Sequence, residues 1–168
     1  ESMKTDIRLC KEAGCDGVVI GLLNADGTVD RERTSMLVDM AYPMGVTFHR
    51  AFDRTRDAFE ALETLIDVGC ERVLTSGLMP NVNGGKELLK QLVATADERI
   101  IIMPGSGVRH NNLAELAQFT GAVEFHTSAR KAVINPMTFE NPNVTDAGTM
   151  YVADEDELQQ IISLLQQI

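Results

Sequence analysis

The sequence has no tryptophan, only three cysteines and no long uninterrupted run of apolar residues. No run approaches the roughly 20 residues that cross a bilayer, and the first residues lack the apolar core of a secretory signal. We therefore expect no membrane partner. An odd number of cysteines without a CxxC pair favours free thiols in a reducing compartment over a disulfide framework. These absences predict a cytosolic protein in which Cys10, Cys15 and Cys70 are all reduced.

Basic residues are also scarce, since 15 Lys and Arg stand against 25 Asp and Glu and leave a formal net charge of −10. Binding to nucleic acid depends on basic side chains that neutralise phosphate, so no nucleic-acid partner is expected. What is present suits a folded domain, because 44% of the 168 residues are hydrophobic and 24% are charged. A chain of this size and composition predicts a single domain, residues 1–168, with one core.

The hydrophobic pattern alternates between two periods along the chain. Apolar residues at helical spacing predict helices over residues 3–13, 30–41, 57–68, 84–97, 111–119 and 154–168. Short apolar or β-branched runs between them predict five strands, which begin near Val18, Val46, Arg72, Arg99 and Ala122. This βα alternation indicates a parallel sheet with right-handed crossovers.

The end of the chain follows a different pattern. Residues 131–153 show no clear period and contain two prolines, so a long surface loop is expected there. Asp154, followed three positions later by Glu157, has the spacing of a capping box at the start of the terminal helix, residues 154–168.

Four of the predicted strands end in small polar or ionisable residues. In βα barrels the loops after the strands carry the chemistry, and the rest of each strand packs. Five strands do not close a barrel of eight. An open doubly wound sheet would favour a Gly-rich dinucleotide turn after an early strand, and this sequence has no such turn there. The predicted fold class is therefore α/β, a partial TIM-type (β/α) barrel with about five parallel strands of eight.

The strand-end motifs resemble those of the CutC copper homeostasis family in order and in spacing. They are residues 46–53 (VTFHRAFD), 72–77 (RVLTSG), 103–108 (MPGSGV) and 124–130 (EFHTSAR). The resemblance implies the C-terminal two-thirds of a complete βα barrel, with the first three strands absent. Such a barrel would expose two strand edges, so we expect a missing N-terminal segment or a second copy of the chain to complete it.

The resemblance also implies a function in copper homeostasis, with cytosolic copper binding or trafficking and Cu(I) as the metal. The cysteines proposed as copper ligands in the family lie in the first two strands, outside this chain, so the metal ligands here are unknown. Cu(I) prefers thiolate and thioether sulfur. The spacing of Cys10 and Cys15 does not place both thiols on one helical face, and Cys70 lies in a separate turn. We therefore expect no copper site built wholly from this chain.

Ionisable residues at the strand ends suggest acid-base chemistry as an alternative. His49 lies on the same strand face as Thr47, and an imidazole near neutrality can be a general base or a metal ligand. Residues 124, 126 and 128 alternate onto one face in the same way. Each of these residues is equally suited to a structural hydrogen-bond network, with Arg50 and Arg130 as counter-charges. The candidate catalytic residues are His49, Asp53, Glu124 and His126.

A Gly-rich segment suggests an anion site at the same rim. Residues 105–107 follow a strand and precede a helix, where backbone N–H groups can bind an anion, although such glycines also serve simply to turn the chain. Many βα barrels hold phosphate in the loops after their last two strands. The candidate anion-binding residues are Gly105, Ser106, Gly107, Ser128 and Arg50. The alternative function is thus a barrel enzyme acting on a small anionic substrate, such as a phosphorylated one.

Overall fold

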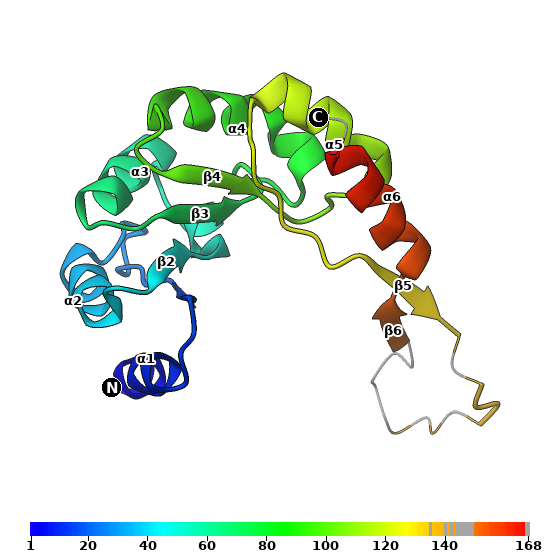
Figure 1. Ribbon diagram of the computed structural model, residues 1–168, viewed down its shortest axis with the longest axis horizontal. Coiled ribbons are helices and arrows are strands. Elements are labelled where there is room, and N and C mark those ends of the chain that lie inside the picture. Colours follow the sequence, from blue (N-terminus) through cyan, green and yellow to red (C-terminus); the bar gives the residue numbers. More distant parts are fainter. Residues whose placement is uncertain (135, 140, 142, 144–149, 167–168) are drawn as a thin grey trace.

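The computed structural model describes residues 1–134, 136–139, 141, 143 and 150–166. Its centre is a parallel sheet in the order β1-β2-β3-β4, with strands Gly17–Ile20, Gly45–Phe48, Arg72–Thr75 and Ile101–Pro104. Helix α1 (Ser2–Glu12) precedes β1, and the helices after successive strands are α2 (Arg31–Ala41), α3 (Ala58–Asp67), α4 (Val82–Ala96) and α5 (His110–Thr120). These four helices line the convex side of a curved sheet (Figure 1). The predicted partial TIM-type barrel is confirmed.

The alternation of side chains along each strand divides the sheet into two faces. Phe48 of β2 and Val73 of β3 are fully buried and belong to the core between sheet and helices. The opposite face follows the parallel register, in which Val19 lies beside Thr47 and Thr47 beside Arg72. Because the barrel is not closed, this inner face is partly exposed, and Val19 has 63% of its surface accessible.

Local signals in the sequence explain where the helices begin and end. The Asp30 carboxylate accepts a hydrogen bond from the Arg33 N–H and caps α2, as predicted, and Asp57 and Asn81 cap α3 and α4 in the same way. Gly121 ends α5 with a φ of 74°, a conformation that glycine adopts without a steric penalty. No helix in the described part of the chain is long and apolar enough to cross a membrane.

The fifth predicted strand is not formed as a strand in the described residues. Only a single parallel bridge links Gly105 to His126, although residues 122–128 run beside β4. Within the described residues the segment pairs along one edge only. The sheet therefore has four full strands rather than the five predicted.

The prediction of a long loop over residues 131–153 is wrong at both ends of that segment. Strands β5 (Arg130–Val133) and β6 (Met150–Ala153) pair in antiparallel fashion there, because each offers the other a full register of backbone partners. They project away from the main sheet beside α6 (Glu155–Leu165) (Figure 1). Within the predicted loop, residues 135, 140, 142 and 144–149 lie outside the described residues, as do residues 167–168 of the predicted terminal helix.

The terminal helix begins where predicted, but the capping box is wrong. Asp154 occupies the N-cap position without a side-chain cap hydrogen bond, and its carboxylate accepts a hydrogen bond from the Lys131 ammonium at 3.1 Å. Glu157 accepts hydrogen bonds from the backbone N–H of His110, at 2.8 Å, and pairs with the His110 ring. Both carboxylates therefore serve tertiary contacts that the local spacing does not reveal.

Candidate functional site

A cavity of about 270 Å³, called the rim cavity below, lies at the carboxyl end of the sheet. It is bounded by the loop that follows β4 and by the loop that follows His126. It is lined by Arg50, Leu74, Ser106, Gly107, Val108, Arg109, His126, Thr127, Ser128 and Arg130. Four of the five predicted anion-binding residues are in this set. The fifth, Gly105, sits directly beside it, since a Cβ added there would lie 3.3 Å from the Cβ of His126.

The loop after β4 is held in shape by its neighbours. Ser106 and Gly107 have φ values of 76° and 87°, so two successive residues adopt the left-handed conformation. The Ser106 hydroxyl donates to the carbonyl of Pro80 at 3.0 Å, and the Ser106 carbonyl accepts from the Val82 N–H at 3.0 Å. Two left-handed residues in succession turn the backbone toward the cavity at a fixed place beside the start of α4.

The next loop is pinned to the first by Thr127. Its hydroxyl donates to the carbonyl of Val108 at 2.8 Å and accepts from the N–H of Ala129 at 3.1 Å. This arrangement leaves Ser128 exposed on the wall of the cavity. The two loops that a barrel commonly uses to hold phosphate are thus joined to each other around one cavity.

Three guanidinium groups give the cavity its positive character. Arg50 is held by its Nε donating to Asp53 at 2.6 Å and its Nη2 donating to Ser76 at 2.7 Å. Arg130 lies over the ring of Tyr151 at 4.5 Å, and Arg109 stands at the start of α5. The chain has a net charge of −10, so three arginines around one cavity make a locally basic site on an acidic protein. Arg109 was not among the sequence candidates, although its place just before a predicted helix was visible.

Asp53 acts as an anchor for the loop after β3. One carboxylate oxygen accepts hydrogen bonds from the Thr75 hydroxyl at 2.5 Å and from the backbone N–H groups of Ser76 and Leu78 at 3.0 and 3.2 Å. The other oxygen accepts from Arg50 and from the Ser76 hydroxyl. The predicted counter-charge Arg50 is therefore present. With every lone pair engaged and only 8% of the side chain exposed, Asp53 is placed to hold structure.

His49 lies apart from this network. Its Nδ1 accepts a hydrogen bond from the Ala51 N–H at 3.0 Å, which puts the ring proton on Nε2 when the imidazole is neutral. The ring covers Gly21, where an added Cβ would come within 2.4 Å of the His49 Cε1. In the described residues no hydrogen bond joins His49 to Asp53, and His49 does not line the rim cavity. The two candidates are near in sequence but contact different groups.

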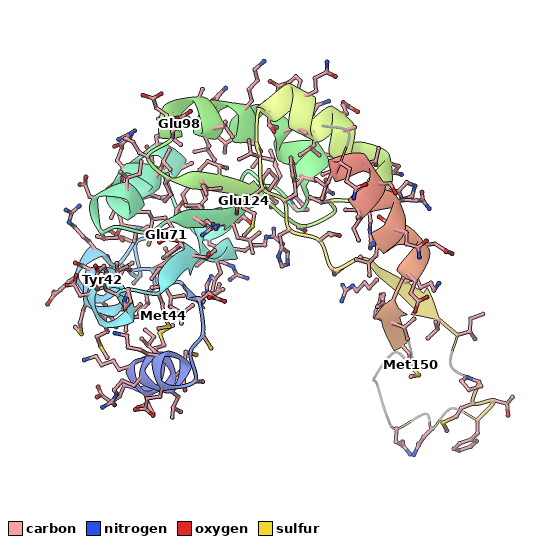
Figure 2. All side chains as sticks on the ribbon, in the orientation of Figure 1. Tyr42, Met44, Glu71, Glu98, Glu124 and Met150 are labelled. Carbon is pink, nitrogen blue, oxygen red and sulfur yellow. The ribbon has the colours of Figure 1, made fainter. Side chains whose placement is uncertain are left out.

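Glu124 lies on the inner, concave side of the sheet (Figure 2). Its carboxylate pairs with the guanidinium of Arg72. The guanidinium donates from Nε and Nη2 to the two carboxylate oxygens at 2.7 and 3.1 Å, and Arg72 also reaches Glu71 at 3.1 Å. The hydrogen bonding of the guanidinium to the Glu124 carboxylate is the main cause that raises the pKa of Arg72. The expected counter-charges were Arg50 and Arg130, and neither was assigned to Glu124; its partner is Arg72, on the strand two positions away across the inner face.

Of the four acid-base candidates, only His126 lines the cavity. Its backbone N–H donates to the carbonyl of Pro104 at 2.9 Å, which fixes the segment against the end of β4, and its side chain is exposed. The structure thus brings His126 together with Arg50, Ser106 and Ser128, and separates it from His49 and Glu124. The catalytic and binding roles of these residues stay predictions.

The described residues hold no group of three or more His, Cys, Asp or Glu side chains that could bind a metal ion. All three cysteines are free. Cys70 is buried, and that burial raises the pKa of its thiol to about 12, which makes it a poor ligand at neutral pH.

A curved parallel sheet, helices on its convex side and an anion-sized cavity at its carboxyl end together define a TIM-type barrel protein, here with the barrel open. The model of the CutC family matches residues 1–131, and the chain belongs to that family. A protein of Parabacteroides distasonis named as a CutC family protein is 49% identical over 160 residues, which cover 95% of this chain and 65% of the relative.

Mammalian relatives carry a functional name. The copper homeostasis protein cutC homolog of Mus musculus is 48% identical over 144 residues, which are 86% of this chain and 53% of that protein. Among solved structures, the putative copper homeostasis protein CutC of Streptococcus agalactiae superposes with a TM-score of 0.70 at 29% identity, covering 73% of this chain and 60% of that one. The chain spans about three fifths of the length of the relatives it matches.

Proposed function

We propose that the protein acts in copper homeostasis and that it binds or traffics Cu(I) in the cytosol. The observation that carries this proposal is sequence identity of 46–48% to mammalian proteins named for copper homeostasis. Identity at this level over 86% of the chain extends through all the strand-end motifs. The proposal concerns the whole protein, of which this chain corresponds to a part of the relatives' length.

The main copper ligands belong, in this proposal, to the strands that the longer relatives have before the region matched here. That placement agrees with the lack of a three-ligand cluster among the described residues. The chain supplies the carboxyl-terminal wall of the barrel, and the ion pair of Arg72 with Glu124 lies on its inner face. A partner for that face is required, either the preceding segment or a second copy, because apolar residues such as Val19 are exposed on it.

A competitive Cu(I) titration under anaerobic, reducing conditions tests this proposal. The 168-residue chain is compared with a version in which the amino-terminal strands of a close relative are restored. Tighter binding by the restored protein, abolished when the added cysteines become serine, supports the proposal. Equal affinity of the restored protein and its serine variant contradicts it.

A second candidate function is favoured by the rim cavity, namely catalysis on a small anionic substrate. Three arginines, two serines and an exposed histidine converge there, and the volume of about 270 Å³ suits a ligand smaller than a typical drug molecule. His126 is the acid-base candidate within reach of such a ligand. Asp53 positions Arg50, and Glu124 contributes through the inner-face ion pair rather than through contact with the ligand.

Thermal shift with inorganic phosphate and a panel of phosphorylated metabolites tests this candidate. Ligand binding raises the unfolding temperature of the wild type, and Arg130→Gln should lose that increase. Lys90→Gln removes the same charge outside the cavity and should keep it. Because part of the attraction is Coulombic, the increase should shrink in high salt. Identical responses of wild type, Arg130→Gln and His126→Asn to every compound would exclude this function.

A further inference from the structure

The carboxyl end of α1 folds back on itself and brings Cys15 to Cys10. The N–H of Gly14 donates to the Lys11 carbonyl at 3.2 Å, and the N–H of Cys15 donates to the Cys10 carbonyl at 3.0 Å. Gly14 adopts a φ of 76° between them. This pair of bonds is a Schellman motif, in which the side chains of the two outer residues frequently contact each other. The argument from helical spacing does not extend to Cys15, because α1 ends at Glu12 and Cys15 lies in the turn.

The two cysteines are the outer residues of this turn, and neither is buried. Cys15 is exposed and Cys10 is half-buried, whereas Cys70 is buried in the core. The pKa of Cys10 is raised, first by its partial burial and then by the Coulombic and hydrogen-bond interactions with the Cys15 thiol, with a smaller effect of Asp6.

The chemistry of the pair selects the cation. A soft monovalent ion such as Cu(I) is satisfied by two thiolates, whereas structural zinc takes four ligands, and the described residues supply no cluster of that size. The carbonyl groups at the end of α1 carry the negative pole of the helix dipole, which also favours a cation. We propose that Cys10 and Cys15 form a two-thiolate site for Cu(I) at the carboxyl end of α1.

Binding at this site replaces two S–H bonds with two S–Cu bonds and releases two protons, while copper keeps its oxidation state. The apparent affinity therefore rises by about 100-fold per pH unit below the thiol pKa values, against about tenfold for a single thiolate. The site goes beyond the proposed function, whose copper ligands lie in strands preceding this region in the relatives. The geometric argument for this site rests on the Schellman turn at the end of α1.

The experiment is an anaerobic competition between the 168-residue chain and a colorimetric Cu(I) chelator, repeated from pH 6 to pH 8 with the chelator's own protonation taken into account. Wild type should take up one equivalent of Cu(I) with the two-proton pH dependence. Cys10→Ser and Cys15→Ser should each lose that uptake. Cys70→Ala, which removes a buried thiol elsewhere, should retain it. Far-ultraviolet circular dichroism shows whether each variant keeps its helix content.

Three results would overturn the proposal. They are no uptake by the wild type, full uptake by either serine variant, or a one-proton pH dependence. The copper homeostasis proposal is judged separately, on the thiols of the restored amino-terminal strands. A restored protein that binds copper without Cys10 and Cys15 would support that function while these serine variants decide the thiol pair.

Discussion

Asp53→Asn should destabilise the protein by far more than a typical change of a charged residue. The Asp53 carboxylate joins η1 (Arg50–Arg54) to the loop after β3, and it accepts hydrogen bonds from Arg50, Thr75, Ser76 and Leu78. An amide keeps one acceptor oxygen, which can still serve Thr75 and the two backbone N–H groups. Its NH₂ group, however, then faces the Arg50 Nε–H, which donates to the carboxylate, whereas the Ser76 hydroxyl can donate to the Met79 carbonyl and accept from the amide.

The magnitude follows from the lost Arg50 bond and from the amide N–H that is left facing a donor, which costs about 1–3 kcal/mol. A hydrogen bond to a charged group contributes about 1.5–3 kcal/mol, and the Arg50 bond counts toward the lower end because 41% of that side chain is exposed. The expected loss is about 3 kcal/mol in the free energy of unfolding. In a chain of this size that loss lowers the thermal midpoint by about 6–12 °C.

Urea denaturation followed by circular dichroism measures the loss directly. Asp67→Asn is the matched control, because Asp67 also pairs with an arginine, Arg31, at 3.0 Å, but both side chains are more than half exposed. The control should show little change. If Asp53→Asn is as stable as Asp67→Asn, the anchoring role inferred for Asp53 is wrong.

Three further predictions concern the core, a close approach and pH. Phe48→Ala should cost about 3–5 kcal/mol by urea denaturation, because Phe48 is fully buried. Gly85→Ala should destabilise strongly in the same assay, since the added Cβ would lie 1.9 Å from the Ser76 carbonyl oxygen. Glu157 is held below its ordinary pKa: burial acts to raise the pKa, but the hydrogen bonds from His110 outweigh it. Its stabilisation is therefore present above the unfolded-state value, 4.5, and lost as pH falls through the lower folded-state value. Thermal midpoints measured from pH 3 to pH 6 should fall less steeply in Glu157→Gln than in the wild type.

Each of these predictions has a matched control. Phe59→Ala removes a ring that is 40% exposed and should cost much less than Phe48→Ala. Gly84→Ala adds a methyl group at ordinary contact distance, 3.6 Å from Met79, and should be neutral or stabilising. Glu155→Gln, at an exposed position of α6, should leave the acid dependence unchanged. Equal effects within the glycine pair, or within the phenylalanine pair, would contradict the packing described.

The sequence predicted most of the fold because the signals for it are local. Helical periodicity and the N-cap at Asp30 each depend on a few neighbouring residues, and the helices appear where those signals lie. A strand was predicted at residues 122–128 from their apolar pattern, but the structure has only a single bridge there. A strand also needs neighbours to pair with, and in the described residues this segment has one on a single edge. Pairing of β5 with β6 was missed since its residues show no alternation.

The candidate site shows the same division. Residues after successive parallel strands had to meet at one edge of the sheet, so Ser106, Gly107, Ser128 and Arg50 could be grouped from the sequence alone. Which ionisable groups pair could not be found in this way. Arg72 was not among the expected counter-charges, yet it is the partner of Glu124, because the curvature of the sheet decides which side chains approach across the inner face.

The sequence by itself determined the order of helices and strands from α1 to α5, the family and the edge of the sheet where polar residues collect, since each depends on short-range pattern or on motif order. Only the tertiary structure decided which side chains touch. In the described residues it left His49 without a hydrogen bond to Asp53, and it used Glu157 to bind His110. The reason is geometric: a contact depends on the path of the backbone through turns and between layers, and residue spacing within one element does not specify that path.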